Sequence, residues 1–140
     1  MRADDINDII KATHTYARGL DLHDSKEAVS AFTPDCVWDA TAVGLKRYEG
    51  EADLLAFFEA DAAAVDKQCH IITNHLIDFD GDDTAHGTNY VYAEGEMKSG
   101  GAIKAIALNK DRYVRTPDGW KISERVIEPL TTPQMAGFDV

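Results

Sequence analysis

Residues 69–94 read CHIITNHLIDFDGDDTAHGTNYVYAE, and this stretch decides the fold. Its two halves, 69–79 and 84–94, are rich in the β-branched and aromatic residues that favour strands. Between them stands a cluster of turn-forming residues, DGDD at 80–83. The stretch therefore predicts two long antiparallel strands joined by a turn.

The segments on either side extend this pattern into a complete domain. Two further strands are expected at 102–115 and 119–128, joined by a Thr-Pro-Asp-Gly turn. Apolar residues three and four apart predict helices over 4–20 and 51–66. The remaining expected elements are a short helix at 25–32 that Asp24 caps and that Pro34 ends, a strand at 36–40 and a partner strand at 45–48, whereas the tail from 129 to 140 shows no periodicity.

This order of elements predicts the fold class. An antiparallel sheet with one apolar face needs helices to cover that face. Gly87 and Gly95 lie inside the expected strands and indicate bends that would curve the sheet. The 140 residues therefore predict one α+β domain, a conical barrel with three N-terminal helices on the concave face of a curved, mostly antiparallel sheet and a cavity at its open end.

Composition limits the classes of function. The chain has 14 Lys and Arg against 25 Asp and Glu, a net charge of -11, and no basic face is visible for nucleic acid or an anionic membrane. Neither a signal peptide, nor a dinucleotide or phosphate loop, nor clustered metal ligands can be recognised. We therefore expect a cytoplasmic protein that needs no metal or cofactor and that handles a small organic molecule.

Four motifs, in order along nearly the whole chain, resemble those of SnoaL-like domains of the nuclear-transport-factor-2-like superfamily. They are a Tyr…Asp…Phe…Asp-x-Val-Trp pattern over Tyr16–Trp38, HIITN at His70–Asn74, DGDDTA at Asp80–Ala85 and DRYVRTPDGWKI at Asp111–Ile122. Within this superfamily, scytalone dehydratases and hexachlorocyclohexane dehydrochlorinases look nearest. The resemblance implies a lyase that uses an Asp–His pair inside the cone.

The resemblance also implies which residues form the site. Asp24 and His70 match the catalytic pair, and Asn109, Arg125 and Trp38 match residues that line the pocket and bind substrate. The two tyrosines that hold a water on the substrate in the dehydratases fall at His23 and Ala40, and their second histidine falls at Gly95. We therefore expect the general base of these dehydratases to be retained and the groups that hold the water on the substrate to differ.

A carboxylate beside a histidine fixes the tautomer of the ring and stabilises the imidazolium that forms, which makes a general base. The expected function is a cofactor-independent elimination of water or halide from a small cyclic, mostly apolar substrate. The bland alternatives are that Asp24 only caps a helix and that His70 is an ordinary strand residue.

Two other functions stay open. Tyr16 fits core packing, but it also matches the oxyanion-holding tyrosine of ketosteroid isomerases, so a proton transfer of the isomerase or polyketide-cyclase type is one alternative. Their catalytic aspartate would fall at Ala40, next to Asp39. The second alternative is a non-catalytic module that binds a ligand or a partner. Such a module would fill the cone with side chains.

The long strands also predict self-association. The helices can cover only one face of the sheet, and the strands carry apolar residues on more than one: Ile71, Ile77, Tyr90, Tyr92, Ile106 and Leu108. We therefore expect a homodimer or homotrimer formed through the outer face of the sheet.

Overall fold

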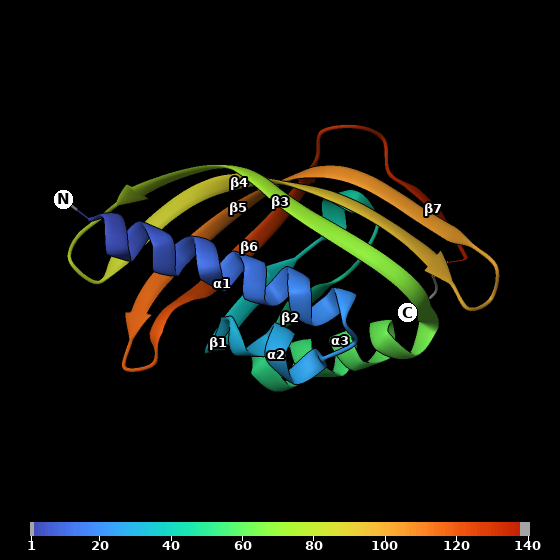
Figure 1. The fold of residues 1–140 in the computed structure, drawn as a ribbon, viewed down its shortest axis with the longest axis horizontal. Coiled ribbons are helices and arrows are strands. Elements are labelled where there is room, and N and C mark those ends of the chain that lie inside the picture. Colours follow the sequence, from blue (N-terminus) through green and yellow to red (C-terminus); the bar gives the residue numbers. More distant parts are fainter. Residues whose placement is uncertain (1, 138–140) are drawn as a thin grey trace.

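The computed structural model describes residues 2–137 and has the expected order of helices and strands (Figure 1). The helices are α1 (Ala3–Asp21), α2 (Ser25–Ser30) and α3 (Glu51–Ala64), with a short 3-10 turn at Thr41–Val43. The strands are β1 (Phe32–Asp39), β2 (Arg47–Glu49), β3 (Val65–Phe79), β4 (Thr84–Met97), β5 (Ala102–Thr116), β6 (Gly119–Pro129) and β7 (Gln134–Ala136).

The strands form one seven-stranded sheet with the order β2-β1-β6-β5-β4-β3, and β7 pairs with β5 off this path. All pairs are antiparallel except β1 with β6. The sheet curves over the helices, and α1 lies across its inner side (Figure 1). The predicted α+β class and the curved, mostly antiparallel sheet are therefore confirmed. The sheet is not closed into a barrel, because β2 and β3 form its two ends.

Two element predictions need correction. The second helix ends at Ser30, so Phe32 and Pro34 belong to β1 and Pro34 does not terminate the helix. The tail contains β7, whose three residues pair with the start of β5. β7 forms by pairing with the edge of β5. The sequence of the tail alone does not show that this partner is available.

Helix α1 packs on the sheet through one face, and its last turn also contacts α2 closely. Ile9, Thr13, Tyr16 and Leu20 are buried on that face. A Cβ added to Gly19 would lie 2.4 Å from the backbone nitrogen of Ala28, so only glycine allows this approach of α1 to α2. No helix within residues 2–137 is long and apolar enough to span a membrane.

A bulge in β3 changes which residues face the core. The pairing with β4 shifts register between Thr73 and Leu76, and Asn74 there has a positive φ of 57°. The bulge inverts the alternation of side chains, so Ile77 packs against the core and Leu76 is 71% exposed. Of the apolar strand residues named above, Ile77 therefore lies on the inner side of the sheet.

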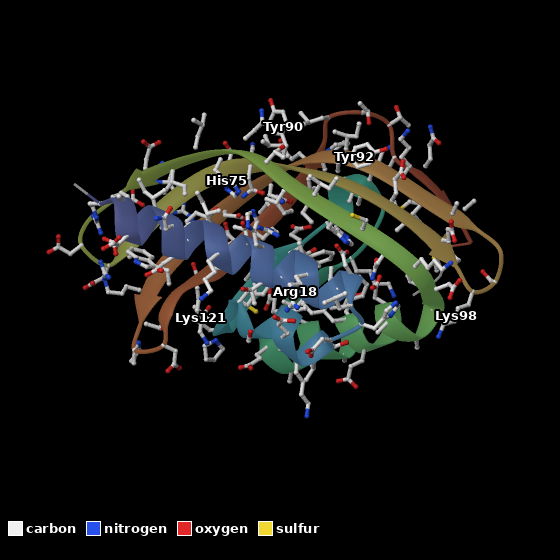
Figure 2. All side chains as sticks on the ribbon, viewed as in Figure 1. Arg18, His75, Tyr90, Tyr92, Lys98 and Lys121 are labelled. Carbon is white, nitrogen blue, oxygen red and sulfur yellow. The ribbon has the colours of Figure 1, made fainter. Side chains whose placement is uncertain are left out.

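The outer face of the sheet still carries exposed apolar side chains. Tyr90 and Tyr92 point away from the helices (Figure 2), and Ile71, Leu76, Tyr90 and Leu130 are each at least 41% exposed. The helices cover the opposite face and leave this one uncovered. Self-association through it stays a prediction.

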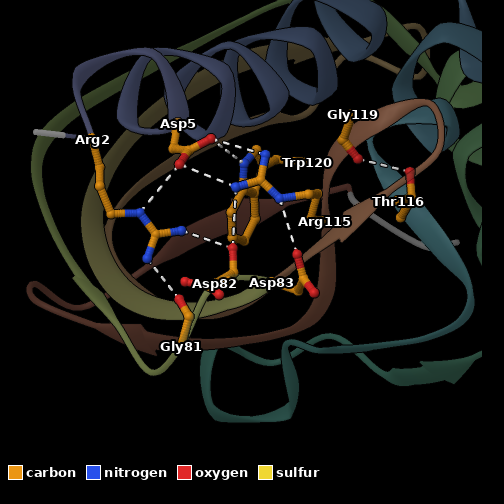
Figure 3. Close-up of polar contacts among 9 residues, drawn as sticks. All are labelled: Arg2, Asp5, Gly81, Asp82, Asp83, Arg115, Thr116, Gly119 and Trp120. Atoms are coloured by element: carbon orange, nitrogen blue, oxygen red, sulfur yellow. Dashed lines mark hydrogen bonds and ion pairs between the residues drawn. The ribbon is translucent and has the colours of Figure 1, made fainter.

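Polar contacts tie the start of α1 to two turns of the sheet (Figure 3). Asp5 accepts hydrogen bonds from the guanidinium of Arg115 at 3.1 Å, from the indole nitrogen of Trp120 at 3.0 Å and from Arg2 at 3.1 Å. Arg2 also donates to the carbonyl oxygens of Gly81 and Asp82. The bonds from Arg115 and Trp120 lower the pKa of Asp5 from 3.8 to about 2.

This pKa shift predicts how stability depends on acid. A carboxyl whose pKa is lower in the folded state stabilises the fold above pH 3.8, and that contribution is lost as the pH falls towards about 2. Asp5→Asn should therefore be less stable than the wild type near neutral pH, and the difference should shrink between these two values. Urea denaturation over a pH series measures it.

Asp4→Asn is the control, because Asp4 is exposed on the same helical turn. A stability difference between wild type and Asp5→Asn that stayed constant down to pH 2 would contradict the role given to Asp5.

Candidate active site

A cavity of about 90 Å³ lies between the inner side of the sheet and helices α1 and α3. Most of its wall is apolar, which suits a mostly apolar ligand. Leu20, Trp38, Val43, Phe57, Val91, Ile127 and Met135 are among its apolar lining residues. Its polar lining residues are Tyr16, Asp61, Gln68, His70 and Asn109.

His70, which lines the cavity, forms a carboxylate–imidazole pair with Asp21. The Nδ1 atom of His70 lies 2.7 Å from Oδ1 of Asp21, and the backbone N–H of His70 donates to Oδ2 at 2.9 Å. Both side chains are largely buried, at 12% and 20% exposure for His70 and Asp21. An ionised carboxylate can only accept, so Nδ1 carries the proton and Nε2 is left as an acceptor.

The partner of His70 is therefore Asp21, and the expectation of an Asp24–His70 pair is wrong. Asp24 is the N-cap of α2, where its side chain accepts a hydrogen bond from the backbone N–H of Glu27 at 3.1 Å. The two aspartates diverge because the chain turns between them at His23, which has a positive φ of 57°. Asp21, the last residue of α1, reaches β3, while Asp24 begins the next helix.

Of the expected substrate-binding residues, Tyr16, Trp38 and Asn109 line the cavity. The ring of Tyr16 lies edge-on to that of His70, with centroids 6.3 Å apart, and burial raises the pKa of its hydroxyl to about 12. Trp38 packs against Phe57 at 5.1 Å between centroids.

Asn109 lines the cavity, and its side chain has an unused acceptor. Its amide nitrogen donates to Oδ1 of Asn89 at 2.8 Å, and its own Oδ1 is buried without a hydrogen-bond partner in residues 2–137. An unsatisfied buried acceptor costs about 1–3 kcal/mol, so a ligand hydroxyl that donated to it would recover that cost.

Arg125 is buried beside the cavity and is not among its lining residues. Its Nε and Nη2 donate to the two oxygens of Asp111, each at 2.8 Å, and its guanidinium carbon lies 4.8 Å from the centroid of the Tyr16 ring. Burial alone would lower the pKa of Arg125, but the charge and hydrogen bonds of Asp111 outweigh it and the pKa is raised. Asn89 and Tyr113 also donate to Asp111, so the hydrogen-bond network links β4, β5 and β6.

Three residues that sequence reasoning missed belong to the site: Asp21, Asp61 and Gln68. Asp61 could have been found, because it continues the buried stripe of α3 after Leu54, Phe57 and Phe58 at helical spacing. An acid on an apolar stripe is unusual and indicates a special environment. Gln68 gave no such signal.

Among residues 2–137, no group of three or more His, Cys, Asp and Glu side chains is placed to hold a metal ion. His23, at the position of a dehydratase tyrosine, does not line the cavity. Its two ring nitrogens lie 3.2 Å from the carbonyl oxygens of Ala62 and Asp66.

Comparison with known proteins identifies a family and several similar folds. The family model described as a SnoaL-like domain matches residues 1–126. No curated protein matches the chain. A candidate aromatic ring hydroxylase from Novosphingobium aromaticivorans is 27% identical, with a TM-score of 0.90 over 95% of this chain and 94% of that one.

Two further solved structures share the fold at lower identity. A candidate scytalone dehydratase from Novosphingobium aromaticivorans is 18% identical, with a TM-score of 0.83 over 96% of this chain and 88% of that one. A type 3 hexachlorocyclohexane dehydrochlorinase from Novosphingobium barchaimii is 21% identical, with a TM-score of 0.75 over 98% and 92% of the two chains.

Proposed function

Because the chain belongs to the family of SnoaL-like domains, we propose that it is a cofactor-independent lyase of the dehydratase or dehydrohalogenase type. Its substrate is a small cyclic, mostly apolar molecule. The observation that carries the proposal is the hydrogen bond from Nδ1 of His70 to Asp21 at the wall of an apolar cavity. Similar folds among dehydratases and dehydrochlorinases support the class of reaction.

In this mechanism His70 is the general base and Asp21 orients it. Asp21 is itself fixed, since its second oxygen accepts the backbone N–H of His70. Nε2 removes a proton from a substrate carbon, the electrons of that C–H bond form a double bond, and the leaving group departs from the neighbouring carbon. Asp21 stabilises the imidazolium that forms.

The other polar residues position the substrate. The unpaired Oδ1 of Asn109 accepts from a substrate hydroxyl, and Trp38 forms an apolar wall. Arg125, paired with Asp111, lies against the ring of Tyr16 and supports that side chain at the cavity.

A second candidate function is an isomerase-like or cyclase-like proton transfer by the same base. The observation that favours it is the Tyr16 ring beside His70, because a tyrosine hydroxyl in an apolar cavity can hold a developing oxyanion. A non-catalytic binding module is less favoured, since the cone keeps an open cavity and the Asp–His pair is assembled at its wall.

The direct test is turnover by the purified, EDTA-treated protein on a panel of cyclic hydroxy-ketones, cyclic ketones and polyhalogenated rings. Loss of water or halide supports the lyase, and a double-bond shift without a leaving group supports the isomerase alternative. Activity that vanished on chelation would contradict both.

Two neighbouring aspartates allow a matched test of the pair. Asp21→Asn should lower kcat/KM at least about 10-fold, because partners that orient a histidine through its second nitrogen contribute about 10–100-fold in metal sites. In the wild type, each of the two N–H groups of His70 donates to a different oxygen of Asp21. Asparagine has one oxygen and one NH₂ group, so its NH₂ would face one of these donors. The measurement is kcat/KM on a substrate found in the panel.

Asp24→Asn is the control. Asparagine caps helices about as well as aspartate, so this variant should keep both its activity and its stability. Equal losses in Asp21→Asn and Asp24→Asn, or a loss in Asp24→Asn alone, would contradict the assignment of Asp21.

A further inference from the structure

The cavity wall contains a buried carboxyl group that the mechanism above does not use. Asp61 lies in α3 on the same face as the buried Phe57 and Phe58, and it is 6% exposed. Transfer of a carboxylate to such a place costs free energy unless it is paired or protonated. The other acids of α3, Glu51, Asp53 and Glu59, are exposed.

Asp61 has one hydrogen-bond partner in the part of the chain that the structure describes. The amide nitrogen of Gln68 donates to Oδ2 of Asp61 at 2.7 Å and to the carbonyl oxygen of Leu20 at 3.0 Å. These two bonds use both amide hydrogens and hold Asp61 close to the end of α1, next to Asp21. Oδ1 of Asp61 has no partner within residues 2–137 and remains available to a bound molecule.

The surroundings of Asp61 raise the pKa of its carboxyl group. Burial is the largest effect and raises its pKa above 3.8, while the bond from Gln68 and the charges of His70 and His23 act in the opposite direction. The negative charge of Asp21 raises it further. An apolar substrate that displaces water from the cavity strengthens the effect of burial.

We propose that Asp61 is the catalytic proton donor of this cavity and completes an acid–base pair with His70. The proposal rests on the proposed lyase function. Nε2 of His70 takes a proton from the substrate carbon, and the C–H electrons form the double bond. The C–O bond of the neighbouring carbon breaks, and its oxygen takes the proton of Asp61 and leaves as water.

The step balances without any other reactant. It leaves His70 protonated and Asp61 ionised, and exchange with water returns a proton to Asp61 and removes one from His70. Hydroxide is a poor leaving group and needs this proton, whereas halide departs as a stable anion and does not. The donor therefore directs the site toward substrates with a hydroxyl as the leaving group.

The leaving group makes the experiment specific. Asp61→Asn keeps the shape of the side chain and an acceptor for Gln68 but cannot donate an acidic proton. We expect it to lower kcat on a β-hydroxy-ketone by about 10²–10⁴-fold. On the matched β-halo-ketone, kcat should be unchanged. Glu59→Gln, an exposed acid-to-amide change in the same helix, is the control and should retain both activities.

A second readout does not depend on turnover. Carbon-13 NMR of the side-chain carboxyls, assigned by comparison with Asp61→Asn, measures the titration of Asp61 directly. We expect its pKa to lie above 3.8 and to rise when a non-reactive cyclic ketone fills the cavity. In the wild type, kcat/KM on the hydroxyl substrate should fall as the pH passes this pKa, and that limb should be missing for the halide.

The outcomes separate the two proposals. If His70→Ala leaves both reactions unchanged, the lyase proposal itself fails. If His70→Ala slows both reactions but Asp61→Asn slows both equally, or neither, the proton-donor role is overturned. A titration of Asp61 at or below the ordinary value overturns that role whatever the activities are.

Discussion

Replacing His70 with alanine should lower kcat/KM by about 10²–10⁴-fold on any substrate that the protein turns over, because a general base contributes about that much. Nε2 of His70 is the acceptor that the Asp21 hydrogen bond leaves available at the cavity. The effect should appear mainly in kcat, since the lost interaction is with the proton in transfer and not with the bound ring. Circular dichroism should show an intact fold.

The chain supplies its own control for this experiment. His86 also forms an imidazole–carboxylate contact, with Nδ1 2.8 Å from Oδ1 of Asp80, but both side chains are about half exposed and neither lines the cavity. His86→Ala should therefore keep full activity. An equal loss in both variants would show that the location of His70 in the cavity is irrelevant, and an active His70→Ala would exclude it as the base.

Replacing Asp111 with alanine should lower the free energy of unfolding by about 3–5 kcal/mol, because it leaves the buried guanidinium of Arg125 without its counter-ion. Asn89 and Tyr113 also lose the oxygen to which they donate. The free energy of unfolding of a domain is only about 5–15 kcal/mol. If that of the wild type lies at the lower end of this range, a large fraction of the variant molecules will be unfolded. Urea denaturation followed by circular dichroism measures the change.

Arg112→Ala is the matched control, one residue along the same strand. Arg112 pairs with Glu124 at 3.8 Å on the surface, where such pairs contribute about 0–1 kcal/mol. Similar losses for Asp111→Ala and Arg112→Ala would contradict the importance of burial. A small loss for Asp111→Ala alone would mean that water reaches Arg125 and replaces its partner.

Local patterns predicted the fold well because most of its elements follow their own periodicity. The stripe of α1 and the turns at 80–83 and 116–119 each act within a few neighbouring residues. The bulge at Asn74 was not predictable in this way, since its shift of register depends on the pairing of β3 with β4. Because of that shift Ile77 packs against the core, whereas unbroken alternation from Ile72 would point it to the other face.

The candidate site was predictable in part for a similar reason. As the resemblance implied, the cavity is lined by His70, Tyr16, Trp38 and Asn109. The partner of His70 was misidentified because Asp21 and Asp24 are only three residues apart, and the turn at His23 decides which of them reaches β3. Nothing in the local sequence encodes that choice.

The strand β7 gives the cavity two unlike sides, and this has a consequence for selectivity. Met135, in β7, lines the cavity together with the packed aromatic rings of Trp38 and Phe57, and three residue pairs join β7 to β5. Methionine is unbranched and adapts to different shapes, whereas packed aromatic rings do not. A series of ring compounds should therefore tolerate an added methyl group where it meets Met135 and reject the same group where it meets Trp38. Discrimination between close analogues would then depend on which edge of the ring carries the substituent, more than on total size.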